Sequence, residues 1–461
     1  MEEKNTPRPG SSPVLDQPDA VHHLRAELGA KEIEAGGRLS PAPSTSTDEV
    51  PIPTPPALEP PPDGGLQAWL QVLGSTVVLI NTWGLINTFG VYQAYYETDL
   101  LSSNSPSDIS WIGSVQASLL LLMGVFSGPL FDAGYFRSLL ITGLFLIVFG
   151  QFMTSLCTLY WQILLAQGFC IGIGMGLVFL PSAAIISQYF SRHRALALGI
   201  SSAGSPVAGT VFPIIFSRLE PIVGFAWTSR VFAFILLALS IIPVLFMRTR
   251  VPPTGRARAI IDKSVFTDGA FLAFASAGFL SFLVLYVPFF YITLFARSHH
   301  TTTDSFAPYL VTLLNVGSIF GRIIPNALAD RLGCLNVLSV CMFASSIMVL
   351  GWMGVHDLGG SVVFTLMYGL FSGAVVSLTP SVIFSMSPDI SRVGARLGMN
   401  FLVTGISILI GTPIAGAILT DFTNAQWLGA MGYTAGAFVV STVLHAIARF
   451  VLFKRNGRWK D

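Results

Sequence analysis

The sequence predicts an all-α membrane protein with about twelve transmembrane helices, arranged as two pseudo-symmetric six-helix bundles. Only 11% of the 461 residues are charged and 52% are hydrophobic, whereas about 25% of the residues in a soluble domain are charged. The apolar residues fall into blocks of about 20, the length that a helix needs to cross the hydrocarbon core. Short sequence landmarks also recur, in the same order, in the two halves of the chain.

The first 62 residues differ from the rest of the chain. They contain 13 of the 28 prolines and scattered charges without an apolar period, a composition typical of disordered segments. No positive region followed by a short apolar core is present, so the segment does not resemble a signal peptide. We expect residues 1–62 to form a disordered cytoplasmic tail, and the first span to act as the insertion signal.

Twelve apolar segments follow this tail, and each is long enough to span a bilayer. They cover residues 69–92, 109–131, 138–158, 161–188, 195–217, 228–247, 269–294, 306–327, 334–355, 359–385, 396–420 and 427–452. An even number of spans places both ends of the membrane part on the same side.

The distribution of lysine and arginine indicates which side that is. Of the 20 such residues outside the tail, 17 fall at cytoplasmic loops or span ends if the N-terminus is cytoplasmic, and the exceptions are Arg218, Arg230 and Arg297. Cationic loops are retained in the cytoplasm during insertion. We therefore expect an integral multi-pass protein, in the plasma membrane, with both termini in the cytoplasm.

A basic loop at residues 248–266 separates six spans from six more. It divides the chain into an N-terminal bundle at 63–247 and a C-terminal bundle at 267–454, followed by a short cytoplasmic tail at 455–461. Such duplicated six-helix units are typical of secondary transporters.

Two landmarks mark this duplication. An Asp and Gly pair follows the second span, at Asp132 and Gly134, and another follows the eighth, around Asp330 and Gly333. A Pro-x-Ala-Gly sequence ends in Gly209 in the fifth span and recurs near the end of the eleventh. Their common order favours an internal repeat over chance.

Three stretches resemble the major facilitator superfamily and, within it, the monocarboxylate porter-like group, especially its fungal members. They are Asp63-Gly64-Gly65 with Trp69, the stretch from Tyr189-Phe190 through Arg192-His193-Arg194 to Gly199, and the loop motif at Asp132 and Asp330-Arg331. The resemblance extends from Asp63 to about Lys454. It implies the twelve-helix fold of that superfamily and solute transport by alternating access.

The sequence departs from that group at positions that matter for coupling. Its proton-coupled members carry a lysine in the first span and an aspartate four residues before an arginine in the eighth. The corresponding positions are Asn87 and Ser318, so only Arg322 is kept. The first-half loop motif also has Ala133 where an arginine is usual. The resemblance therefore implies the fold more strongly than the proton-coupled mechanism.

Arg322 is the main candidate for substrate binding. Asn315, Ser318, Arg322 and Asn326 lie on one helical face, because they are spaced by 3, 4 and 4 residues. An arginine at membrane depth is costly and by default marks a functional site, and its guanidinium suits a carboxylate. In the alternative interpretation, Arg322 reaches the cytoplasmic interface or holds the loop containing Asp330.

Two further polar stripes lie in the first and eleventh spans. Their hydroxyl and amide groups either line a solute pathway or hold helices together, and both interpretations stay open. With the eighth span they give the substrate-binding candidates Arg322, Asn315, Ser318, Asn81, Asn87, Thr88, Tyr92, Asn400 and Thr404.

Charged residues at the cytoplasmic ends of the spans are candidates for a gate. Ion pairs there would break as the two bundles rock, and the alternative is that these charges only set the topology. The gating candidates are Asp132, Asp330, Arg331, Arg192 and Arg194.

These observations predict a secondary transporter for a small organic solute, an organic acid or a secondary metabolite. The missing lysine and aspartate favour export over the import of a monocarboxylate or vitamin. A transporter-shaped nutrient sensor is the alternative from another class, since the tail would permit partner recruitment. No clustered catalytic or metal-ligating residues indicate an enzyme, a metal site or a cofactor, no ATP-binding domain is present, and a net charge of +1 gives no case for nucleic acid.

Overall fold

The computed structural model describes residues 61–191, 194–250, 262–387 and 393–457, and these residues form helices and connecting segments without a β-strand. Almost all of the predicted tail therefore lies outside the described residues. The helices are α2 (Leu66–Leu79), η1 (Ile80–Gly84), α3 (Leu85–Tyr95), η2 (Tyr96–Leu100), α4 (Pro106–Leu122), α5 (Gly124–Asp132), α6 (Phe136–Thr154), α7 (Tyr160–Ile163), η3 (Leu164–Ile171), α8 (Gly172–Tyr189), α9 (Arg194–Phe246), η4 (Lys263–Thr267), α10 (Gly269–Leu285), α11 (Val287–Ser298), α12 (Tyr309–Leu332), α13 (Cys334–Trp352), α14 (Leu358–Met386), α15 (Val393–Ile418) and α16 (Asn424–Asn456).

Eleven helical stretches of the described chain are long and apolar enough to cross a membrane. One of them, Leu196–Phe246, has 51 residues, which at 1.5 Å per residue amounts to about 77 Å, far more than one crossing of a core about 30 Å thick. Gly224 interrupts it with a φ of 76°, a backbone conformation that favours glycine. The stretch therefore supplies both the fifth and the sixth span, and the predicted all-α membrane fold is confirmed.

The glycines in the two copies of the Asp and Gly landmark share the same positive φ. Gly134, between α5 and α6, has a φ of 95°, and Gly333, between α12 and α13, has a φ of 94°. In both places the chain reverses between two spans within a few residues. The sequence repeat thus corresponds to a repeated turn.

The start of the first span is fixed by contacts with the segment after α8. The Asp63 backbone N–H donates to the Tyr189 carbonyl at 3.0 Å, and an Asp63 carboxylate oxygen accepts from the Ser191 N–H at 2.5 Å. The Trp69 ring packs edge-on against Phe190, with ring centroids 5.4 Å apart. Two stretches that carry the family resemblance are therefore in contact.

The first span is longer than predicted. Apolar pattern alone ended it at residue 92, but the helix continues to Leu100 through the π-helical segment η2. Aromatic packing holds these extra turns, because Tyr95 stacks on Phe225 with centroids 5.2 Å apart and the Tyr96 hydroxyl donates to Gln167 at 2.6 Å.

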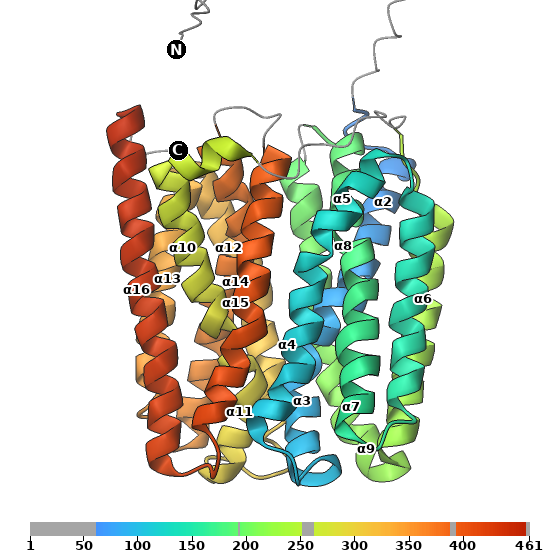
Figure 1. The fold of residues 1–461 in the computed structure, drawn as a ribbon, viewed down its shortest axis with the longest axis vertical. Coiled ribbons are helices and arrows are strands. Elements are labelled where there is room, and N and C mark those ends of the chain that lie inside the picture. Colours follow the sequence, from blue (N-terminus) through green and yellow to red (C-terminus); the bar gives the residue numbers. More distant parts are fainter. Residues whose placement is uncertain (1–60, 192–193, 251–261, 388–392, 458–461) are drawn as a thin grey trace, which may run out of the picture. The chain divides into compact units, whose positions relative to one another are not determined.

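Helices before residue 250 meet helices after residue 262 along a contact surface that we call the seam. Three helix pairs make most of its contacts: α4 with α15, α9 with α12, and α3 with α11. Figure 1 shows α4 and α3 next to α15 and α11, where the two sets of helices adjoin. The Ser107 hydroxyl donates to the Pro413 carbonyl across it at 3.0 Å, and Ser114 hydrogen-bonds to Thr412.

The repeated Pro-x-Ala-Gly sequences lie at this seam. A Cβ added at Gly209 in α9 would lie 2.5 Å from Cγ of Asn315 in α12, and one added at Gly416 in α15 would lie 2.7 Å from Cα of Ser107 in α4. Both glycines therefore permit a close approach between helices from opposite halves of the chain. The two copies of the landmark have the same structural role.

Candidate functional site

Arg322 lies in α12 at the seam and is buried, with 6% of its surface exposed. Its Nη1 donates to the carbonyl oxygen of Ser202 in α9 at 2.9 Å. Its Nε is buried and has no hydrogen-bond partner. The guanidinium also interacts electrostatically with the phenol of Tyr286, at the start of α11. The cation is thus tied to the other half of the chain by one nitrogen and keeps donor capacity.

A stripe of small residues on α9 faces these polar groups. Ser202, Ser205 and Gly209 share one helix face, since they are three and four residues apart. The Ser205 hydroxyl accepts from Nδ2 of Asn87 in α3 at 3.1 Å, and Gly209 lies against Asn315 of α12. The fifth span therefore brings Arg322, Asn87 and Asn315 to one wall, although they come from two distant parts of the sequence.

A chain of aromatic rings crosses the seam beside this wall. Tyr286 stacks on Trp83 with centroids 6.3 Å apart and an interplanar angle of 16°. Trp83 contacts Phe179 of α8 at 5.8 Å, and Phe179 contacts Phe401 of α15 at 6.2 Å. Trp83 belongs to the π-helical segment η1, a type of irregularity that is frequent at functional sites. Aromatic side chains from both halves of the chain therefore pack together at the seam, where Trp83 and Tyr286 are buried.

Several buried polar atoms near this surface have no hydrogen-bond partner. Within the described residues they include Nε of Arg322 and Oδ1 of Asn315; both amide atoms of Asn400 are also unpaired, but its Oδ1 lies toward Gly278 of α10. Leaving such groups unpaired in a membrane interior costs free energy. A bound polar solute would supply the missing partners. The arrangement offers unpaired donors and acceptors to a polar solute.

Other predicted site residues point elsewhere. Asn81 donates to the Ser240 hydroxyl at 3.0 Å and so faces the sixth span. Ser318 packs against Gly373 of α14, in its own half of the chain. Tyr92 lies in an aromatic cluster, and its hydroxyl accepts from Gln151 at 3.3 Å. The hydroxyls of Thr88 and Thr404 donate within their own helices, to the carbonyls of Gly84 and Asn400 at 2.8 Å and 2.9 Å.

The predicted gate stays a prediction. Arg192 lies outside the described residues, as do the side chains of Arg194 and Asp330. Asp132 ends α5, and Arg331 is exposed in the last turn of α12.

A buried charge network that sequence reasoning missed lies at the predicted cytoplasmic end of α15. Arg396 is 1% exposed; its Nε lies 3.2 Å from an Asp262 carboxylate oxygen and its Nη1 lies 3.0 Å from one of Asp268. Hydrogen bonds from Ser264, with the pairing to Arg396, lower the pKa of Asp262. In the sequence, Arg396 counted only as a loop charge, because its partners are more than a hundred residues away.

Glu97 is a second residue that the sequence reading missed. Its Oε1 accepts from Gln93, and its Oε2 is buried without a partner. It interacts electrostatically with Tyr291 of α11, which hydrogen-bonds to Ser110 of α4. The apolar pattern ended the first span before this residue, so no carboxylate was expected inside it. Glu97 is placed inside the span only by the continuation of the helix to Leu100, which the structure shows.

Comparison with protein families gives one match that covers most of the chain. The family model described as Major Facilitator Superfamily matches residues 67–368 and 299–458.

Known fungal proteins are similar to this chain over most of its length. It is 43% identical over 386 residues to the MFS-type transporter dbaD of Emericella nidulans, a match covering 84% of this chain and 87% of that protein. It is 37% identical over 423 residues to the aspyridones efflux protein apdF of the same organism, covering 91% and 86%. The MFS-type transporter eupM of a Phoma species is 52% identical over 217 residues, covering 47% and 77%.

Proposed function

The chain belongs to the Major Facilitator Superfamily, and we propose that it exports a small organic acid or acidic secondary metabolite by alternating access. Its helices and its relatives make it an integral multi-pass membrane transporter and not an enzyme. The substrate, the direction and the binding residues are the proposed part.

The observation that carries the proposal is the environment of Arg322. A guanidinium that is buried at the seam, tied to α9 by one hydrogen bond and still holding an unpartnered Nε, is suited to bind a carboxylate or enolate. Asn315, Asn87 and Asn400 would hydrogen-bond to the rest of the solute. The Tyr286 and Trp83 rings would pack against its apolar body.

The position of this site supports alternating access. Arg322 bonds to Ser202 across the seam, so rocking of one half against the other would break or remake that contact. A solute that replaces the Ser202 carbonyl as the partner of Arg322 would favour one arrangement over the other, which is how a ligand shifts a conformational equilibrium. We place the rocking units at residues 63–247 and 267–454, joined by the loop at 248–266, with the predicted gate at their cytoplasmic ends.

Export is supported by a relative whose name describes an efflux protein for aspyridones. The contact between Asp63 and Tyr189, and that between Trp69 and Phe190, support membership in the monocarboxylate porter-like group, since these residues carry the resemblance to it. On the charge bias of the loops, we further propose that both termini lie in the cytoplasm. Export from the cell requires the plasma membrane, and we propose that location with it.

Untargeted metabolite comparison inside and outside cells tests this proposal. The comparison uses cells that lack the chain and cells that express the wild type, Arg322→Gln or Arg230→Gln. We expect an anionic metabolite to move from the cells to the medium with the wild type and Arg230→Gln, and to stay inside in the other two. Arg230 is the matched control because it lies over the Trp227 ring, away from the site. Identical profiles in all four strains would refute export, and movement into the cells would support import.

A further inference from the structure

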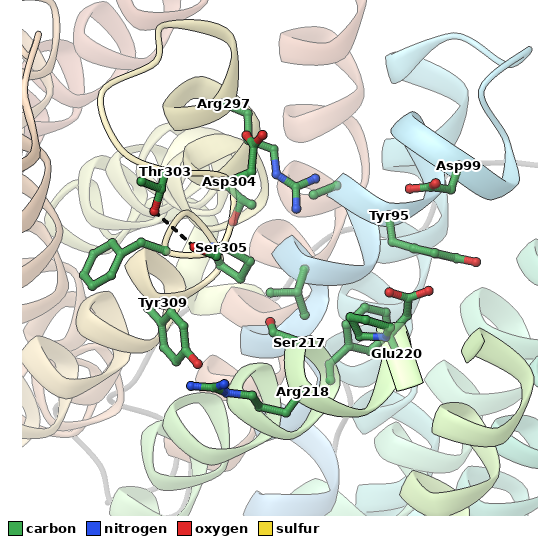
Figure 2. Close-up of a pocket in the computed structure, with 17 residues that line it drawn as sticks. Tyr95, Asp99, Ser217, Arg218, Glu220, Arg297, Thr303, Asp304, Ser305 and Tyr309 are labelled. Atoms are coloured by element: carbon green, nitrogen blue, oxygen red, sulfur yellow. Dashed lines mark hydrogen bonds between the residues drawn. The ribbon is translucent and has the colours of Figure 1, made fainter. Parts of the chain in front are cut away.

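A cavity lies between those ends of the spans that face outward in the predicted orientation. It has a volume of about 520 Å³ and is lined from both sides of the seam, by α3, η2 and α9 on one side and by α11, the segment after it and the start of α12 on the other (Figure 2). Arg218 and Arg297, two of the three exceptions to the charge bias, belong to its lining.

A layer of packed side chains separates this cavity from the central site. Along α3 the order is Asn87, Phe89 and then Val91, and only Val91 lines the cavity. The Phe89 ring contacts Phe290 of α11 with centroids 4.7 Å apart. The cavity is therefore a separate space, with the seam closed beneath it.

Arg297 has an unpaired hydrogen-bond donor in this cavity. Its Nε is buried without a hydrogen bond, and within the described residues no ion pair joins its side chain to a carboxylate. Figure 2 shows its guanidinium pointing from the end of α11 into the cavity. Unsatisfied donor capacity on a partly buried guanidinium is a site for an acidic group.

Carboxylates surround this arginine without pairing to it. Asp99 and Asp304 are exposed and Glu220 is half-buried, and Glu220 interacts electrostatically with both Asp99 and Arg297. Like charges that a ligand would bring next to these groups are repelled. The lining holds the three carboxyl groups of Asp99, Glu220 and Asp304 against the two guanidiniums of Arg218 and Arg297, so a second negative charge on a ligand would meet an excess of like charge. The lining therefore selects against dianions.

Apolar and aromatic groups form the rest of the wall. Val91, Ala94 and Phe216 are buried, and Tyr95 is held flat against Phe225 at an interplanar angle of 9°. Tyr309 lies on the opposite side, and Arg218 of α9 lies over its ring, with Cζ 5.9 Å from the ring centroid. A flat apolar body of a few rings fits such a space.

We propose that this cavity is an external binding site for an organic monoanion with a flat apolar body, whose acid group is bound by Arg297. The site faces the outer solution through the exposed residues Asp99, Thr303 and Ser305. Binding there requires no transport, so the proposal is independent of the export proposed above.

Protection of an introduced cysteine tests this site. Ser305→Cys places a thiol on the exposed rim, and its rate of maleimide labelling is measured in the purified full chain. Labelling of the native cysteines is measured in the chain without this substitution and is subtracted. Benzoate should slow labelling saturably. Benzyl alcohol, which is neutral, and phthalate, which is a dianion at pH 8, should not.

Substitutions of arginine identify the group that binds the acid. Arg297→Gln should raise the benzoate concentration for half-protection about tenfold or more, whereas Arg297→Lys should keep measurable protection because it keeps the charge. Arg230→Gln is the control at the same end of the spans, and Arg322→Gln removes the proposed transport site while leaving this cavity intact. In both variants benzoate should slow labelling as much as it does in the wild type.

Three results would overturn the proposal. Labelling that benzoate does not slow would show that the cavity does not bind it. Equal protection by benzyl alcohol or phthalate would show that binding does not depend on a single negative charge, and an unchanged concentration for half-protection in Arg297→Gln would show that Arg297 does not bind the acid group. Loss of export in Arg322→Gln with benzoate protection retained would separate the two sites.

Discussion

Alanine at Gly416 should weaken packing at the seam, and its effect can be estimated from the contacts. A Cβ there would lie 2.6 Å from the Tyr291 hydroxyl oxygen and 2.7 Å from Cα of Ser107. Because Cα of Ser107 is a backbone atom, the clash can be relieved only if α4 and α15 move apart. Overpacking of this kind costs about 1–3 kcal/mol.

A matched control lies on the same helix. Nothing lies within 4 Å of a Cβ added at Gly398, so Gly398→Ala should gain the helix propensity of alanine, about 0.8–1 kcal/mol. Gly209→Ala should fall between the two variants, because the neighbour it meets is the side chain of Asn315, which can rotate. From the most to the least stable, the expected order is Gly398→Ala, Gly209→Ala, Gly416→Ala.

The assay is thermal unfolding of the purified protein in detergent, combined with maleimide labelling of Ser305→Cys. Gly416→Ala should unfold at a lower temperature than Gly398→Ala, and its reporter should label faster because the seam is loosened near the outer end. If Gly416→Ala were as stable as Gly398→Ala, the close approach of α4 and α15 would be wrong.

Three further outcomes follow from buried charges. Arg396→Gln should lower the free energy of unfolding by about 3–5 kcal/mol, because Asp262 would lose its cation and Asp268 would keep only the half-exposed Arg455; thermal unfolding measures this, and an unchanged midpoint would contradict it. The lowered pKa of Asp262 means that its contribution is present above its unfolded pKa and is lost as the pH falls through its folded pKa. The difference in unfolding midpoint between wild type and Asp262→Asn should therefore be present at neutral pH and shrink as the pH falls below about 4; a constant difference would argue against the pairing. Glu97→Gln should raise the unfolding midpoint at alkaline pH, where the wild type would have to bury a carboxylate oxygen without a partner, while Asp99→Asn on the exposed rim should not; equal effects would show that burial of Glu97 is not the cause.

Much of the fold could be predicted from composition and spacing. Blocks of about 20 apolar residues specify spans because lipid admits few other backbone structures, and the repeated landmarks at Gly134 and Gly333 correspond to turns with the same positive φ. The end of the first span was wrong because Tyr95 and Tyr96 are held by rings from α9 and by Gln167, which local hydropathy cannot show.

The site was predictable only in part. Arg322 stood out because a charge in an apolar segment is conspicuous, and it does lie buried at the seam. Asn81 and Ser318 satisfied the same spacing argument but face spans of their own half. A helical stripe defines a face without saying which neighbour covers it. Trp83 and Phe401 looked like ordinary core residues, and their ring contacts across the seam depend on tertiary packing.

Flux through the isolated protein tests the central claim most directly. The metabolite identified by the cell comparison is loaded into liposomes that contain the purified chain, without ATP, and its appearance outside is followed over time. We predict efflux with the wild type and with Arg230→Gln, and a return to the protein-free background with Arg322→Gln. No efflux with the wild type would contradict the claim that this chain is a carrier, and efflux unchanged in Arg322→Gln would contradict the placement of its binding site.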